Sequence, residues 1–223
     1  PGDFLSQAWI ALSIILTYEP NASGRRTRAP KLKMDTPDFS ELRPEGMVPD
    51  APGLQQRRSA ETKLMILNAA IDSLADWGYS DTTTQLIAKR ANISRGAMLH
   101  HYSTKQDLIA AVIDFAFFRH MEAFSQAIRS LTEEQRAGKN VGIQIEWDSY
   151  NSRQFKAYLE LNNAARTDDE LRSIFIARAQ RHDRYWREEL IANFPEWAEK
   201  PDILDKARRF TQAVMTGMVI NRA

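Results

Sequence analysis

The sequence contains no cysteine, and only four of its 223 residues are histidine. Without cysteine it forms no disulfide and offers no thiolate to a metal, which fits a reducing cytoplasm. The histidines form neither an H-x-x-x-H nor an H-E-x-x-H pair, so the pattern of a zinc hydrolase is missing. A G-x-S-x-G elbow and a glycine loop that cradles phosphate are missing as well. The sequence therefore predicts that the chain is not an enzyme and uses no cofactor.

Long hydrophobic runs are also missing. The apolar stretch Phe4–Leu16 is shorter than the roughly 20 apolar residues of a membrane-spanning helix. A signal peptide would have a basic region before this stretch and a clean small-residue cleavage site after it, and neither is found. Three interpretations remain open: a short helix packed on the body or a partner, a poorly ordered or mis-assigned leader, or a membrane contact. No membrane partner is expected, and a first residue other than Met (Pro1) indicates a fragment or processed product.

Residues 19–56 are predicted to form a flexible linker. Proline recurs six times among Gly, Asp and Ser, and the few apolar residues follow no period. A basic cluster runs from Arg25 to Lys33, whereas the whole chain has a net charge of only +1. Nucleic-acid binding would therefore need a local patch. The cluster is interpreted either as a solvated charge run or as a basic arm that contacts the backbone or minor groove of DNA.

From Ser59 onward the apolar residues recur at helical spacing, and no stretch alternates convincingly with the period of a strand. A first helix is expected from Ser59 to Gly78. Its apolar face comprises Leu64, Leu67, Ile71 and Leu74. A helix over 85–91 and one from Ser94 to Tyr102 follow, separated by a turn at Asn92, whose side chain tolerates left-handed backbone.

The remainder is predicted to be helical too. A fourth helix begins at Lys105, and residues 141–165 form another that breaks near Asn151. Thr167 and Glu170 have the spacing of a capping box, which starts a helix toward residue 190. Pro195 and Pro201 mark a loop, and a last helix begins near residue 202. The predicted fold is all-α: a three-helix head followed by a helical bundle.

Two short helices joined by a three- or four-residue turn are typical of a helix-turn-helix. Its first helix braces against the DNA backbone, and its second lies in the major groove with its N-terminal residues toward the bases. Those residues are Arg95, Gly96 and Ala97. Arginine pairs with guanine through two hydrogen bonds, glycine permits close approach, and alanine contacts a thymine methyl group. The side chains that hold the two helices together are predicted to be Ile87, Ala88, Ile93, Met98 and Tyr102.

The run GYSDTTTQLIAKRANISRGAMLHHYSTKQDL resembles the DNA-binding domain of the tetracycline-repressor (TetR) family of bacterial regulators. The matching residues are Gly78-Tyr79, Thr82-Thr83, Ile87-Ala88, Ala91, Ser94, Gly96, His101-Tyr102 and Lys105. The resemblance is close over residues 57–118 and is found again in YLELNNAARTDDELR. Two positions depart from the pattern: Leu99 stands where the family usually has a tyrosine that reaches the DNA backbone, and Asn92 replaces the turn glycine.

The resemblance implies a set of DNA-binding residues, namely Thr83, Thr84, Ser94, Arg95, Gly96, Ala97, His100, His101 and Lys105. The threonines, the histidines and the lysine would contact phosphates, and the start of the recognition helix would face bases. Each also has a structural interpretation: the threonines as helix caps, the histidines as surface residues, and Arg95 as a phosphate or solvent contact. Trp77 and Tyr79 are expected in the core.

The family's second domain dimerises through its last helices and binds a small molecule, so the resemblance implies a homodimer and an unidentified effector. Two heads about 34–36 Å apart also read a palindrome that one head does not. One further helix is implied beyond the last predicted one. The candidate ligand-binding residues are Trp147, Tyr150, Phe155, Tyr158, Asn162 and His182. They mix aromatic and polar groups as pockets do, although such a stripe is also typical of an ordinary core.

The predicted domains are an N-terminal extension and flexible linker (1–56), a helix-turn-helix DNA-binding domain (57–105) and a helical ligand-binding and dimerisation domain (106–223). The predicted function is that of a cytoplasmic, dimeric, sequence-specific regulator of transcription that binds double-stranded operator DNA. A repressor released by its effector is the expected mechanism, and activation is equally compatible with these residues. The alternative is a protein-binding adaptor whose head does not read DNA, which Arg95, His101 and Lys105 disfavour.

Overall fold

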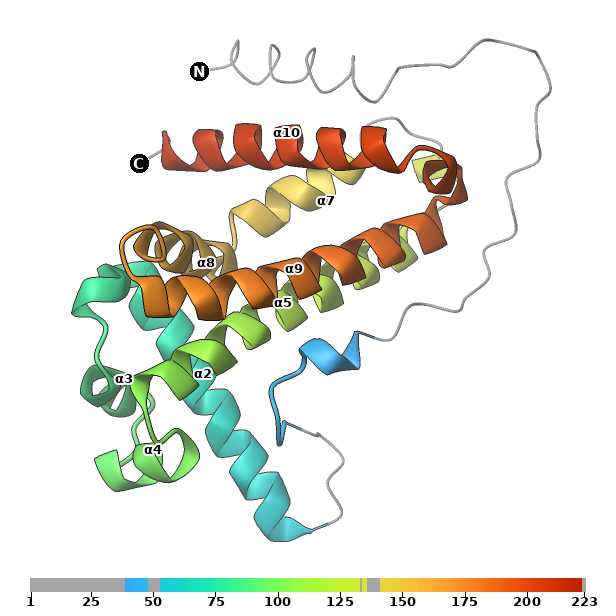
Figure 1. Cartoon of the computed structure of the whole chain (residues 1–223). Coiled ribbons are helices and arrows are strands. Elements are labelled where there is room, and N and C mark those ends of the chain that lie inside the picture. The colour runs from blue at the N-terminus through green and yellow to red at the C-terminus, as the bar shows by residue number, and fades with distance from the viewer. Residues whose placement is uncertain (1–38, 48–52, 133, 136–140, 222–223) are drawn as a thin grey trace, which may run out of the picture. The chain divides into compact units, whose positions relative to one another are not determined.

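The computed structural model describes residues 39–47, 53–132, 134–135 and 141–221, which form helices and no strand (Figure 1). The α-helices are α2 (Leu54–Asp81), α3 (Thr84–Arg90), α4 (Arg95–His101), α5 (Lys105–Ser130), α7 (Val141–Tyr150), α8 (Arg153–Ala164), α9 (Asp169–Asn193) and α10 (Pro201–Ile220). Two 3-10 helices, η1 (Ser40–Leu42) and η2 (Pro195–Glu199), accompany them. The predicted all-α fold class is confirmed.

Two sequence features lie outside the described residues: the apolar stretch 4–16 and the basic cluster 25–33. Within the described part, every helix is too short or too polar to cross a membrane. The chain divides into two compact units, which we treat separately. The head unit comprises the described residues of 39–123 and 151–186, and the second unit comprises those of 124–150 and 187–221.

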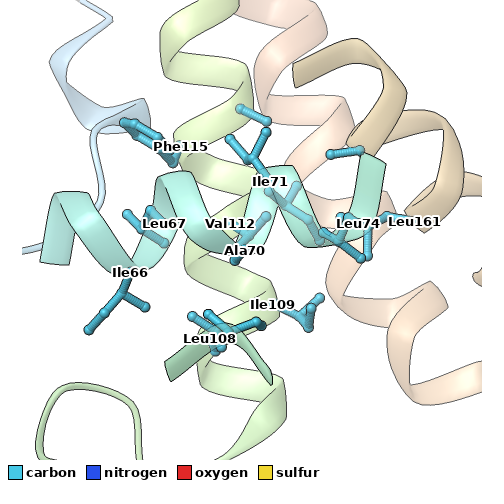
Figure 2. Close-up of a cluster of buried hydrophobic side chains, with 14 of the residues drawn as sticks. Ile66, Leu67, Ala70, Ile71, Leu74, Leu108, Ile109, Val112, Phe115 and Leu161 are labelled. Carbon is cyan, nitrogen blue, oxygen red and sulfur yellow. The ribbon is translucent and has the colours of Figure 1, made fainter. Parts of the chain in front are cut away.

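The core of the head unit forms around α2. This helix packs directly against α8 and α3, and its apolar side chains meet those of α5 (Figure 2). The fully or nearly fully buried residues at this junction include Leu67, Ile71, Leu74, Leu108, Val112, Phe115 and Leu161. Leu64 was predicted on the same face, but its side chain is 41% exposed. Leu54, the first residue of α2, and Met65 are more exposed still. The first turns of α2 therefore lie outside the core.

Helix boundaries in the head unit follow local chemistry. Gly78 leaves the helical conformation (φ 75°, ψ 178°), although α2 resumes for one more turn to Asp81. Asn92 adopts the predicted left-handed conformation with φ 55°, and the Ser94 hydroxyl accepts the Ala97 amide at 3.1 Å as the cap of α4. The break predicted near Asn151 separates α7 from α8. Each of these features depends on residues within a few positions.

The cap of α9 differs from the prediction. The side chain of Asp168 accepts a hydrogen bond from the Leu171 amide at 2.9 Å, which makes Asp168 the N-cap. The Thr167 hydroxyl instead donates to the Ala164 carbonyl at 3.4 Å. The capping box predicted at Thr167 is therefore wrong by one residue, because an aspartate is as strong an N-cap as a threonine and stands next to it.

Residues 39–47, inside the predicted flexible linker, pack against the head unit. The Leu42 side chain is fully buried, and the Tyr185 hydroxyl of α9 donates to the Glu41 carboxylate. Near the end of the segment, the Glu45 carbonyl accepts a hydrogen bond from a lysine of α2 at 2.8 Å. The composition, rich in Pro, Gly and Ser, did not predict that residues 39–47 pack against the head unit. One buried apolar residue and a few polar contacts anchor this segment. The domain boundaries themselves remain predictions.

In the second unit, α10 packs against α7 and η2. The buried apolar side chains of this unit include Phe124, Ile128, Tyr150, Leu204, Ala207 and Met215. An ion pair of 2.6 Å between Arg187 and Asp205 joins α9 to α10. Pro195 begins η2 and Pro201 occupies the first turn of α10, where a missing amide hydrogen is no loss. The stretch predicted as a loop is therefore partly helical.

The core of the head unit yields a stability prediction. We expect Leu67→Ala to lower the free energy of unfolding by about 2–5 kcal/mol, because it leaves a cavity at a fully buried position. Leu64→Ala makes the same chemical change on the same helix at an exposed site, and we expect a loss of about 0.5 kcal/mol. Chemical denaturation of both variants tests this, and equal losses would contradict the described packing of α2.

Candidate functional site

Helices α3 and α4 form the predicted helix-turn-helix. Four residues, 91–94, join them. The side chains predicted to hold them together are buried at Ile87, Ala88, Met98 and Tyr102, and Ile93 is partly buried against the same core. This part of the prediction is confirmed. Because α2 contacts α3 and α3 contacts α4, the recognition helix is held on the body through α3.

The nine candidate DNA-binding residues all lie on α3, on α4, at their N-caps or at the first residue of α5. At the start of α3, Thr83 is exposed, and its hydroxyl accepts the Leu86 amide at 3.2 Å. Thr84 is half-buried behind it. The structural interpretation of Thr83 as a cap is therefore correct, and it is compatible with a phosphate contact, because the remaining free amides at a helix start attract anions.

The first turn of α4 is open. Ser94, Arg95 and Gly96 are exposed, and Ala97 is half-buried. A Cβ added at Gly96 would meet only the Ser94 hydroxyl, at 3.9 Å. Within the chain, nothing forces a glycine here, so Gly96 matters only if something approaches α4 from outside.

The far end of α4 carries two adjacent histidines. The rings of His100 and His101 lie 5.4 Å apart at a steep angle. Partial burial lowers the pKa of His101, and the nearby charges of His100 and Lys63 lower it further. Lys63 belongs to α2 and was not among the predicted residues. Its charge reaches His101 in the folded chain, which the sequence does not reveal.

Lys105, the last candidate, is held by an aromatic ring. Its Nζ lies 4.2 Å from the ring centroid of Tyr79, within the range of a cation–π contact. Tyr79 packs against the core, as predicted, and its hydroxyl donates to Asp168 at 3.4 Å. Burial and the neighbouring Asp168 raise the pKa of Tyr79. Lys105 is therefore half-buried at a fixed place beside α4.

Trp77 is not in the core, contrary to the prediction. Its side chain is 45% exposed, and the Arg90 guanidinium lies 4.8 Å above its ring. It directly precedes Gly78, where α2 departs from helical geometry. Apolar character and helical spacing predicted burial, but indole is large enough that partial cover by an arginine is a stable alternative.

A charged cluster that the sequence reasoning missed joins three helices of the head unit. The Asp76 carboxylate pairs with Arg90 of α3 at 2.5 Å and with Arg153 of α8 at 2.7 Å. Arg153 also pairs with Asp72. Hydrogen bonds from Arg153 and then Arg90 lower the pKa of Asp76. The only sequence signal was the spacing of Asp72 and Asp76, which places both carboxylates on one helix face.

The candidate ligand-binding residues fall into two groups. Phe155, Tyr158 and His182 gather in the head unit around Phe117. The Phe117 ring stacks on His182 at 4.3 Å and lies 5.7 Å from Tyr158, which is 5.6 Å from Phe155. Asn162, on the same helix as Tyr158, is exposed. Trp147 and Tyr150 belong to α7 in the second unit.

His120 of α5, also missed, joins the aromatic group. Its Nδ1 lies 2.9 Å from Nε2 of the buried His182, so one ring donates the shared proton and the other accepts it. Among the described residues, no set of three or more histidine, aspartate or glutamate side chains is placed to hold a metal ion.

Known proteins resemble this chain chiefly in its N-terminal helices. Residues 66–112 match the family model described as bacterial regulatory proteins, tetR family. An uncharacterised HTH-type transcriptional regulator of Mycobacterium tuberculosis is 31% identical over 118 residues, which is 53% of this chain and 60% of that protein. The match thus spans less than two thirds of the mycobacterial protein.

Two further similarities extend along more of the chain. The HTH-type transcriptional repressor AcnR of Corynebacterium glutamicum is 25% identical over 155 residues, covering 69% of this chain and 78% of AcnR. The structure of Salmonella enterica GusR aligns with a TM-score of 0.52 and 21% identity over 71% of this chain and 81% of GusR, which supports the fold. The expectation that the chain is not an enzyme agrees with the regulators named here. The family match over residues 66–112 and these relatives agree with the resemblance of the helix-turn-helix region to the tetR family of bacterial regulatory proteins.

Proposed function

We propose that the chain is a sequence-specific, DNA-binding regulator of transcription. The observation that carries this proposal is the surface of α4: Arg95 and Gly96 are exposed in its first turn, while Met98 is buried beneath them. Insertion into the major groove requires a helix whose first turn is exposed and uncrowded and whose opposite side is buried against the protein. Arg95 would pair with a guanine, and the buried Met98 would hold α4 in place against the body.

Phosphate contacts would flank this base-reading turn. Thr83 and Thr84 would face one phosphate at the start of α3, and Ser94 another at the start of α4. His100, His101 and Lys105 would meet the backbone at the far end of α4. The Lys105 Nζ lies beside the ring of Tyr79, next to the end of α4. These roles place positive or hydrogen-bonding groups at both ends of α4, which supports DNA over a protein partner.

We further propose a homodimer that acts as a repressor and that a small-molecule effector releases from its operator. Exposed apolar side chains on α10, at Ile203, Phe210 and Ile220, support a contact with a second copy. The name of AcnR as a repressor supports repression in this chain. Because DNA is the proposed partner, a cytoplasmic location is part of the same proposal.

The aromatic group of the head unit supports an effector site. Tyr158 and Phe155 of α8 and His182 of α9 line up around Phe117, and they offer apolar rings with two polar groups. The candidate roles of Trp147, Tyr150 and Asn162 remain predictions. If an effector bound one arrangement of α8 and α9 more tightly, it would shift the protein away from the form that binds the operator.

The proposed base contact is tested with Arg95→Ala on the DNA upstream of the protein's own gene, over a salt series. We expect specific binding to weaken by about 1–3 kcal/mol while nonspecific binding changes little, because a base contact is lost. Arg119→Ala, at an exposed arginine on α5, controls for the change of charge. Weak, sequence-blind binding by the wild type, equal in both variants, would favour the adaptor alternative.

A pH dependence follows from His101. Its pKa is held low in the free protein, and a DNA phosphate beside it would raise that pKa, so binding takes up a proton. Operator affinity should therefore rise as the pH falls from about 8 and level off below the pKa of the free protein. Fluorescence anisotropy at constant ionic strength measures this. His101→Gln should flatten the profile, and an unchanged slope in that variant would exclude a phosphate contact by His101.

A further inference from the structure

Arg153, the first residue of α8, makes several polar contacts with one face of α2. Its Nε donates to the Asp72 carboxylate, and its Nη2 donates to the Asp72 carbonyl at 3.0 Å and to Asp76 Oδ1 at 2.7 Å. Asp72 and Asp76 are four residues apart, so their side chains lie one above the other on the helix. The planar fork of a guanidinium fits this arrangement in a way that a lysine does not.

The second oxygen of Asp76 points to a different helix. Its Oδ2 accepts a hydrogen bond of 2.5 Å from Arg90, which is the last residue of α3. The same guanidinium lies over the ring of Trp77. One carboxylate therefore joins α8 to α3, the first helix of the helix-turn-helix. All of these residues belong to the head unit.

Helix α3 is short and depends on such anchors. It has seven residues, of which only Ile87 and Ala88 are buried. A helix of this length is unstable by itself in water and keeps its place through tertiary contacts. Isolated exposed ion pairs contribute little. Here, however, charge-assisted hydrogen bonds share two carboxylates, and this network fixes the C-terminal end of α3 while its buried residues fix the middle.

We infer that Arg153 and Asp76 form a latch through which α8 positions α3, and with it the recognition helix, for operator binding. Arg153 is a positioning residue in this proposal, because nothing places it against DNA. The inference rests on the proposed function and adds the contact through which α8 would influence operator binding. Phe155 and Tyr158, candidate effector contacts, follow Arg153 within two turns of α8. A displacement of α8 would therefore pull directly on Asp76 and α3.

The test compares Arg153→Met with Arg119→Met. Both variants lose one arginine charge. Arg153→Met removes ion pairs with Asp72 and Asp76 that join two helices, whereas the Arg119–Glu122 pair stays within α5. We expect Arg153→Met to weaken operator binding about tenfold without a change in salt slope, since no phosphate contact is removed. Hydrogen exchange of the amides of residues 84–90 should accelerate in the free protein. Arg119→Met should match the wild type in both measurements.

Two further variants sharpen the test. Arg153→Lys keeps the charge without the fork, and we expect an intermediate loss of operator affinity. In an Asp76→Asn background, Arg153→Met should have little further effect on operator affinity, because Arg153 is joined to α3 through the Asp76 carboxylate. Normal operator affinity in a folded Arg153→Met protein overturns the latch, as does an additive double variant. If Arg153→Met does not fold, Arg153→Lys against Arg119→Lys decides in its place.

The proposed function and the latch fail in different ways. Absence of specific DNA binding by the wild type would remove the proposed function. The exchange rates of residues 84–90 are measured on the free protein, so they still decide whether Arg153 holds α3. Unchanged exchange in Arg153→Met, with circular dichroism confirming its fold, would exclude the latch whatever the protein binds.

Discussion

The packing of α2 in the head unit is the interaction on which the rest of the structure depends. Its buried face, with Leu67, Ile71 and Leu74, forms the core that it shares with α5 and α8 (Figure 2). Its polar face carries Asp72 and Asp76, which bind Arg153 and Arg90. One helix thus supplies both the apolar support of the body and the charged attachment of α3. A change in the orientation of α2 would move the helix-turn-helix and break the body at once.

The features that the sequence revealed correctly are local ones. The turn at Asn92, the cap at Ser94 and the break after Tyr150 each depend on residues within a few positions, and all are found where their chemistry predicts. The apolar residues of the helix-turn-helix interface also recur at helical spacing, so each buried residue could be predicted from the sequence. The resemblance to a known family predicts the same arrangement of α3 and α4, whose spacing this interface fixes.

The features that the sequence did not reveal depend on which helices meet. Asp76 and Arg153 are 77 positions apart, and no local pattern links them. Trp77 lies at the surface, where an arginine from α3 partly covers its ring. Leu42 is buried although it lies in a stretch with the composition of a linker. The candidate ligand residues had the same weakness: aromatic side chains at helical spacing indicated an internal face, but not that α7 and α8 would belong to different compact units.

The contrast between the two kinds of contact bears on regulation. The apolar junction of α2 with α5 and α8 is close-packed, so a shift there loses dispersion and burial over many atoms. The polar contacts at Asp76 are partly exposed and screened by salt, so rearranging them costs far less. A small free-energy input, such as the binding of one effector molecule, can therefore redirect α3 at its charged end while the core stays intact. Regulation of operator binding would then depend on the polar contacts of Asp72 and Asp76 rather than on the apolar core around α2.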